Sequence, residues 1–269
     1  MDEVVGGGHG DSVGGGAPPA RIYLTGRVLV EHEDVVRDEA SLPGRLGRLL
    51  FCFLVLNHGQ PLARHELVKA GWGESVPDVV DASLNALMSK LRRFLDGVGL
   101  NGAVAIESSF GSYRLLLPAG SWVDIDQAEL SFHEAEAAAR NADMPSLYAG
   151  ALVAGAVARR PFLAGESLPW VVAQRERLRT LLVRALDYQS DFYQWHREPD
   201  VALKLAQEAV DIEPFRETGH QRLMRLLRDQ GNRAEALRAY ERCRRLLRDE
   251  LGVSPSAETE ALYVTLLKA

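Results

Sequence analysis

The sequence has only two cysteines among 269 residues, too few for a disulfide framework or a four-cysteine zinc site. One of them, Cys52, lies inside an apolar run and is expected to be a small core residue. The longest such run, Leu49 to Leu56, has eight residues, whereas a membrane span needs about 20. The N-terminus also lacks the cationic and apolar segments of an export signal. These absences predict a cytoplasmic protein with reduced thiols and no membrane partner.

An excess of positive charge is also absent. The formal net charge is −6 and the isoelectric point is near 5.7. Residues 21–118 carry 11 cations and 11 anions, so even this segment is neutral. Nucleic-acid-binding domains are usually basic, so any DNA contact must use a local patch and not a global field.

No set of residues typical of an enzyme active site stands out. His65-Glu66 begins a zinc-protease pattern, but Lys69 occupies the place of the second histidine. Residues 10–14 match a nucleophile elbow without the flanking strand and helix that this motif requires. Asp124 and Asp126 are read as the start of a helix. We therefore expect no enzymatic activity, no metal and no cofactor.

Glycine is concentrated at the N-terminus. Residues 1–20 hold seven glycines and two prolines, which predicts a flexible Gly-rich tail. The pattern then changes to short β-rich runs at residues 21–24, 28–30 and 35–37, which are expected to form antiparallel strands.

Residues 44–57 and 64–70 have helical periodicity, and a third helix follows. The β-rich runs 104–107 and 113–117 then predict a hairpin. Strands, three helices and a closing hairpin describe a winged helix-turn-helix over residues 21–118. The apolar face of the third helix is formed by Leu84, Leu87, Met88, Leu91 and Leu95.

Everything after Pro118 is expected to be helical. Ala202-Leu203 recurs as Ala236-Leu237 after 34 residues, the period of the tetratricopeptide helix pair. Asn232 and Glu235 fit a capping box. The fold class is therefore mainly α, a winged helix followed by an all-α, tetratricopeptide-like domain over residues 119–269. The expected helices cover 124–140, 147–157, 168–196, 200–212, 215–230, 232–251 and 256–267.

Three segments carry a resemblance to a known family. They are residues 231–256 (GNRAEALRAYERCRRLLRDELGVSPS), the segment from Arg64 to Trp72, and Ser89-Lys90-Leu91-Arg92-Arg93. The chain resembles the Streptomyces antibiotic regulatory protein (SARP) family of actinobacterial transcriptional activators. The resemblance implies an OmpR-type winged helix fused to a bacterial transcriptional activation domain. It implies double-stranded DNA at repeated promoter sites and RNA polymerase as partners, and leaves open whether the protein is a homodimer.

The third helix has the residues that such a role requires. The amide of Asn85 both donates and accepts hydrogen bonds, as base reading demands. Lys90 is placed to contact a base or a phosphate, and Arg92 and Arg93 to contact phosphates. Arg114 belongs to the wing, near a minor groove. The full set expected to contact DNA is Asn85, Ser89, Lys90, Arg92, Arg93, Arg114 and Arg64.

Two positions depart from the family pattern. Ser109 stands where relatives usually have an arginine in the wing, and Asp81 stands where they often have an arginine at the start of the recognition helix. The absence of two cations removes roughly two phosphate contacts. An alternative function therefore stays open, a regulatory or scaffold module whose winged helix does not read DNA and whose helical repeats bind a protein or small ligand.

Overall fold

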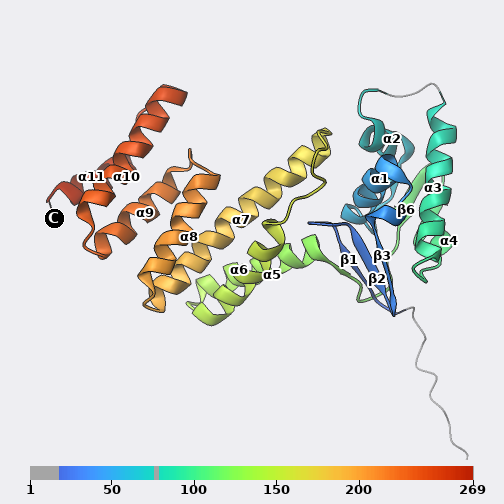
Figure 1. The fold of residues 1–269 in the computed structure, drawn as a ribbon, viewed down its shortest axis with the longest axis horizontal. Helices are drawn as coiled ribbons and strands as arrows, with labels where there is room; N and C mark the ends of the chain where they lie inside the picture. The colour runs from blue at the N-terminus through green and yellow to red at the C-terminus, as the bar shows by residue number, and fades with distance from the viewer. Residues whose placement is uncertain (1–17, 76–78, 269) are drawn as a thin grey trace, which may run out of the picture. The chain divides into compact units, whose positions relative to one another are not determined.

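The computed structural model describes residues 18–75 and 79–268 (Figure 1). It divides into two units. The first contains the described part of Met1–Ile22 together with Arg27–Trp122, and the second contains Tyr23–Gly26 together with Val123–Ala269 up to the last described residue. Most of the expected Gly-rich tail, and the motif at residues 10–14, lie outside the described residues.

The β-rich runs near the N-terminus form strands as expected. They are β1 (Ala20–Tyr23), β2 (Leu29–His32) and β3 (Val35–Asp38), and they join β7 (Trp122–Val123) in a sheet of order β3-β2-β1-β7. Strands β2 and β3 pair antiparallel, from Leu29 opposite Asp38 to His32 opposite Val35. The alternating burial of β2 fits a sheet with one covered face.

Three helices and a second sheet form the winged helix of the first unit (Figure 1). The helices are α1 (Gly44–Leu56), α2 (Arg64–Trp72) and α3 (Val80–Asp96). The sheet has the order β4-β6-β5, in which β4 (Leu62–Ala63) and β5 (Ile106–Ser109) both pair antiparallel with β6 (Ser112–Leu115). Leucines of all three helices are fully buried, and Phe51 meets Phe94 edge to face with ring centroids 5.5 Å apart. This packing seats α3 on α1 and α2.

The prediction of a strand at residues 104–107 is wrong for its first two residues. Val104 and Ala105 belong to a short helix, α4 (Gly102–Ala105). Asn101 Oδ1 accepts from the Val104 N–H at 3.2 Å, and Asp96 Oδ1 accepts from the Gly102 N–H at 2.8 Å. Side chains that bond to nearby backbone groups thus override the strand preference of valine.

The second unit is a series of helices in which each packs against the next (Figure 1). Ala202 and Ala236, the pair found at the 34-residue offset, are both fully buried in one cluster with Leu223 and Met224. Small residues at equivalent contact positions let successive helices approach closely, as in a tetratricopeptide array. The helices are α5 (Asp124–Arg140), α6 (Met144–Ala158), α7 (Pro169–Trp195), α8 (Pro199–Ile212), α9 (Glu217–Asp229), α10 (Arg233–Leu246) and α11 (Ala257–Lys268).

The capping box expected at Asn232 is absent. Asn232 is the N-cap of α10, but its side chain makes no capping hydrogen bond. The carboxylate of Glu235 pairs instead with Arg238, one turn further along the helix. Charge attraction to an arginine at i+3 has therefore replaced the backbone contact.

Asp124 begins α5 as expected, but its carboxylate does more than stabilise a helix start. The side chain is fully buried. Its two oxygens accept from the backbone N–H groups of Leu24 and Thr25 at 2.9 and 3.0 Å and from the Thr25 hydroxyl at 2.7 Å. Asp124 therefore holds the segment Tyr23–Gly26 within the second unit.

Candidate nucleic-acid interface

Helix α3 has two distinct faces. Leu84, Met88 and Leu91 are buried against the rest of the winged helix, whereas Asn85, Ser89, Lys90 and Arg93 are exposed. This division follows from 3.6 residues per turn, because positions three and four apart lie on one side of the helix. The sequence prediction of a seated, polar-faced helix is thus confirmed by burial.

Three cations surround one shallow depression beside α3. Lys90 and Arg93 line it together with Arg37 of β3, and no acidic side chain is among its lining residues. Lys90 and Arg93 form no ion pair in the part of the chain that the structure describes. Arg37 was missed by the sequence prediction, because it is distant in the sequence and only the fold brings it beside the helix.

Arg92 faces elsewhere. It is half-buried, and its guanidinium donates from Nε and Nη2 to the carbonyl oxygen of Ile106 at 3.0 and 2.7 Å. Ile106 is the first residue of β5, so this contact ties the recognition helix to the wing. The structure therefore gives Arg92 a structural contact and does not present it beside Arg93.

Arg64 lies in a hydrogen-bonded network at the start of α3. It donates from Nε and Nη2 to Asp81 Oδ1 at 3.2 and 2.9 Å, and from Nη2 to Asn85 Oδ1 at 3.1 Å. Arg64 Nη1 donates to Tyr113 Oη at 3.2 Å, and that hydroxyl donates to Asn85 Oδ1 at 3.0 Å. The positive charge of Arg64 thereby compensates the negative charge of Asp81 within the protein.

Arg114, the arginine of the wing, is paired with an acidic side chain. Arg114 stands opposite Glu107 in the hairpin register, and the two form a salt bridge of 2.7 Å. Ser89 in turn donates its hydroxyl proton to the main-chain carbonyl oxygen of Asn85 at 3.0 Å. The candidate residues therefore divide into free cations, Lys90 and Arg93, and residues already engaged by the fold.

The tip of the wing is a two-residue turn. Ser109 and Ser112 are the last paired residues of the hairpin, so Phe110 and Gly111 form the loop. Both have positive φ, 46° and 78°. Positive φ at both positions is the pattern of a type I′ hairpin turn, which suits glycine and is costly for phenylalanine. The side chain of Phe110 is fully exposed.

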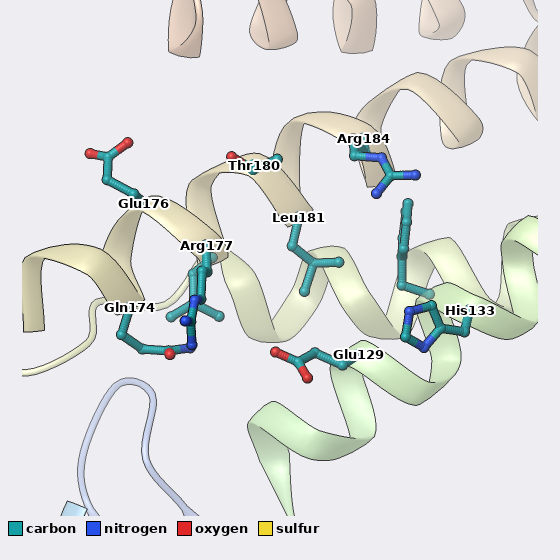
Figure 2. A pocket seen from close by; sticks show the side chains of 10 residues that line it. Glu129, His133, Gln174, Glu176, Arg177, Thr180, Leu181 and Arg184 are labelled. Carbon is teal, nitrogen blue, oxygen red and sulfur yellow. The ribbon is translucent and has the colours of Figure 1, made fainter. Parts of the chain in front are cut away.

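The second unit has a groove between α5 and α7 (Figure 2). Glu129 and His133 of α5 face Leu181 and Arg184 of α7 across it. Arg184 pairs with Glu136, and its guanidinium lies over the ring of Phe132 at 4.6 Å. Since acidic and basic side chains both line the groove, its charge favours no single class of ligand.

The glutamate of the zinc-protease-like pattern, Glu66, has a structural contact. Glu66 Oε2 accepts from the Ala63 N–H at 2.7 Å and so caps α2. Within the described residues, no cluster of histidine, cysteine and acidic side chains is arranged to hold a metal ion. In the same part of the chain, every helix is too short or too polar to cross a bilayer.

The fold and the exposed polar face of α3 define a class, a winged helix joined to a tetratricopeptide-like helical unit. The bacterial transcriptional activator domain model matches residues 123–267, so the chain belongs to that family. The resemblance to the SARP regulators is thereby confirmed.

Known relatives agree with this assignment. The regulatory protein AfsR of Streptomyces coelicolor is 32% identical over 231 residues, which are 82% of this chain and 22% of AfsR. The transcriptional regulatory protein EmbR of Mycobacterium tuberculosis is 26% identical over 229 residues, 82% of this chain and 57% of EmbR. The chain thus spans about a fifth of AfsR and just over half of EmbR. A solved structure of Mycobacterium tuberculosis EmbR, in complex with a low affinity phosphopeptide, has the same fold, with a TM-score of 0.82, 22% identity, and coverage of 93% of this chain and 65% of that one.

Proposed function

We propose that this protein is a DNA-binding transcriptional activator that places α3 in the major groove of double-stranded DNA. The observation that carries the proposal is the depression lined by Arg37, Lys90 and Arg93, because three cations and no acidic side chain are among its lining residues. Lysine and arginine side chains bind phosphate oxygens, and such phosphate contacts position a recognition helix on DNA. A local patch also explains how a chain of net charge −6 could bind DNA.

The remaining parts of the proposal rest on the family. Relatives are named as regulatory and transcriptional regulatory proteins. We propose that the winged helix binds repeated promoter sites and that the helical unit contacts RNA polymerase. A helical array supports this division of roles because its stacked helices form an extended surface for a protein partner.

The DNA-binding step is tested with Lys90→Ala and Arg93→Ala, measured by fluorescence anisotropy on duplex DNA over a salt series. Each variant is expected to bind all sequences more weakly and to lower the slope of log K against log salt by about 0.9 for each phosphate that it no longer neutralises. Lys204→Ala is the matched control, because Lys204 is an exposed lysine of α8 in the second unit. Its binding should equal that of the parent.

The scaffold function is the second candidate, and a specific observation favours it. Arg64, Arg92 and Arg114, three of the expected DNA contacts, are engaged within the protein. If the parent binds no duplex at low salt, DNA binding is excluded and the scaffold function leads. If Lys90→Ala and Arg93→Ala bind like Lys204→Ala, the proposed phosphate contacts are wrong.

A further inference from the structure

The network at the start of α3 fixes which way the amide of Asn85 points. Arginine has donors and no acceptor, so the Asn85 atom 3.1 Å from Arg64 Nη2 must be the carbonyl oxygen. Tyr113 Oη accepts from Arg64 Nη1, so its own proton is available for the same oxygen at 3.0 Å. Both lone pairs of Asn85 Oδ1 are therefore occupied.

The network is held in place from both sides. Tyr113 is 6% exposed and cannot turn away without disturbing the core. Asp81 Oδ1 accepts two hydrogen bonds from Arg64, and hydrogen bonds between ionised groups are the stronger kind. The amide nitrogen of exposed Asn85 donates to no group in the described part of the chain. Asn85 thus presents a donor to the outside and keeps its acceptor inside.

This orientation has a consequence for base recognition. An asparagine reads adenine by donating to N7 and accepting from N6, which needs both halves of its amide. Guanine instead offers two adjacent acceptors, N7 and O6, in the major groove. Resting on the proposed DNA-binding function, we propose that Asn85 is a donor-only reader that selects guanine over adenine. Asp81, Arg64 and Tyr113 are its positioning residues.

The test is selection from a randomised duplex library with the full chain. The parent is expected to enrich sites with guanine at one position, favoured over adenine by on the order of tenfold. Asn85→Asp has the same shape and keeps an oxygen for Arg64 and Tyr113, but it lacks the amide donor. It should lose the preference at that position alone, as should Asn85→Ala. Circular dichroism and thermal unfolding serve as the control that each variant is folded.

A second variant tests the positioning. In Arg64→Leu combined with Tyr113→Phe, the amide oxygen is released, so the preference at the same position should move toward adenine. Adenine selected by the parent at the Asn85-dependent position would overturn the inference, as would an unchanged preference in Asn85→Asp, which would show a structural role only. Duplex binding without any Asn85-dependent position overturns this inference and leaves the proposed function standing. Absence of any duplex binding at low salt overturns both.

Discussion

Arg92 and Arg93 are adjacent in the sequence, yet their side chains serve different purposes. Successive residues of an α-helix are about 100° apart around the axis. Arg93 consequently faces solvent, whereas Arg92 reaches the Ile106 carbonyl. A similar division separates Lys90, which is free, from Arg64, which neutralises Asp81. At the scale of single residues, whether a cation is available to a ligand depends on the ion pairs and hydrogen bonds that its side chain already makes within the protein.

Replacing these two arginines should change the free energy of unfolding by different amounts. Arg92→Leu removes a charged donor from a partly buried carbonyl and should lower the free energy of unfolding by about 1–3 kcal/mol. Arg93→Leu should change stability by less than about 0.5 kcal/mol, because it removes an exposed side chain. Urea denaturation measures both. Equal loss of stability in the two variants would show that the bond to Ile106 contributes nothing.

The hairpin of the wing was predicted from the sequence, but the backbone conformation at its tip was not. The β-rich runs at residues 104–107 and 113–117 predict a hairpin, and a hairpin is present over residues 106–115. The left-handed conformation of Phe110 at its tip is not predictable from propensity, because phenylalanine avoids that region. The four-residue α4 was missed for a similar reason, since Asn101 and Asp96 act through specific contacts that appear only in three dimensions.

Phe110→Gly should stabilise the winged helix by about 1 kcal/mol, because glycine adopts a positive φ without steric cost. Phe110→Ala is the matched control, since it removes the same side chain and keeps a Cβ. Thermal unfolding of both variants separates the backbone effect from the side-chain effect. The same gain in both variants would argue that exposure of the ring, and not the backbone, is unfavourable.

The junction of α9 and α11 depends on one carboxylate. Glu217 accepts from the Ser256 N–H at 2.9 Å and from the hydroxyls of Ser256 and Thr259. Burial raises the pKa of Glu217, but these hydrogen bonds lower it by more, so the net pKa lies below its ordinary value. The charged form is therefore favoured in the folded state.

This lowered pKa predicts acid sensitivity of the helical unit. The stabilisation is complete above the unfolded glutamate pKa of about 4.3, and it is lost as the pH falls through the lower pKa of the folded state. Glu217→Gln should be less stable than the parent at pH 7, and the difference should shrink on acidification. Chemical denaturation at several pH values measures this, with exposed Glu258→Gln as the control. A difference that stays constant with pH would contradict the prediction.

At the scale of the whole molecule, the sequence predicted the change from a winged helix to a helical array and most helix boundaries. Those predictions depend on periodicity, which is local. The membership of Tyr23–Gly26 in the second unit could not be predicted, because it rests on the buried carboxylate of Asp124, about a hundred residues away. Likewise, the free cations beside α3 could be distinguished from the paired ones only after Arg37, Tyr113 and Ile106 had been placed.

Asp124→Ala should lower the free energy of unfolding of the second unit by about 2–5 kcal/mol, because the N–H groups of Leu24 and Thr25 would be left without their acceptor. Glu129→Ala, an exposed change on the same helix, should have little effect. Urea denaturation followed by helical circular dichroism measures both. A loss no larger than that of Glu129→Ala would show that the segment Tyr23–Gly26 adds no stability to this unit.

Because the second unit takes four residues from before Arg27, it is not a continuous piece of chain. A truncated protein expressed from Val123 onward would lack the backbone groups that bind Asp124, so the cut meant to isolate the helical unit would damage it. The same holds for chimaeras, in which an exchange at Val123 leaves the second unit with a segment from the wrong parent. Swapping Tyr23–Gly26 together with the helices would keep Asp124 with the segment that it binds.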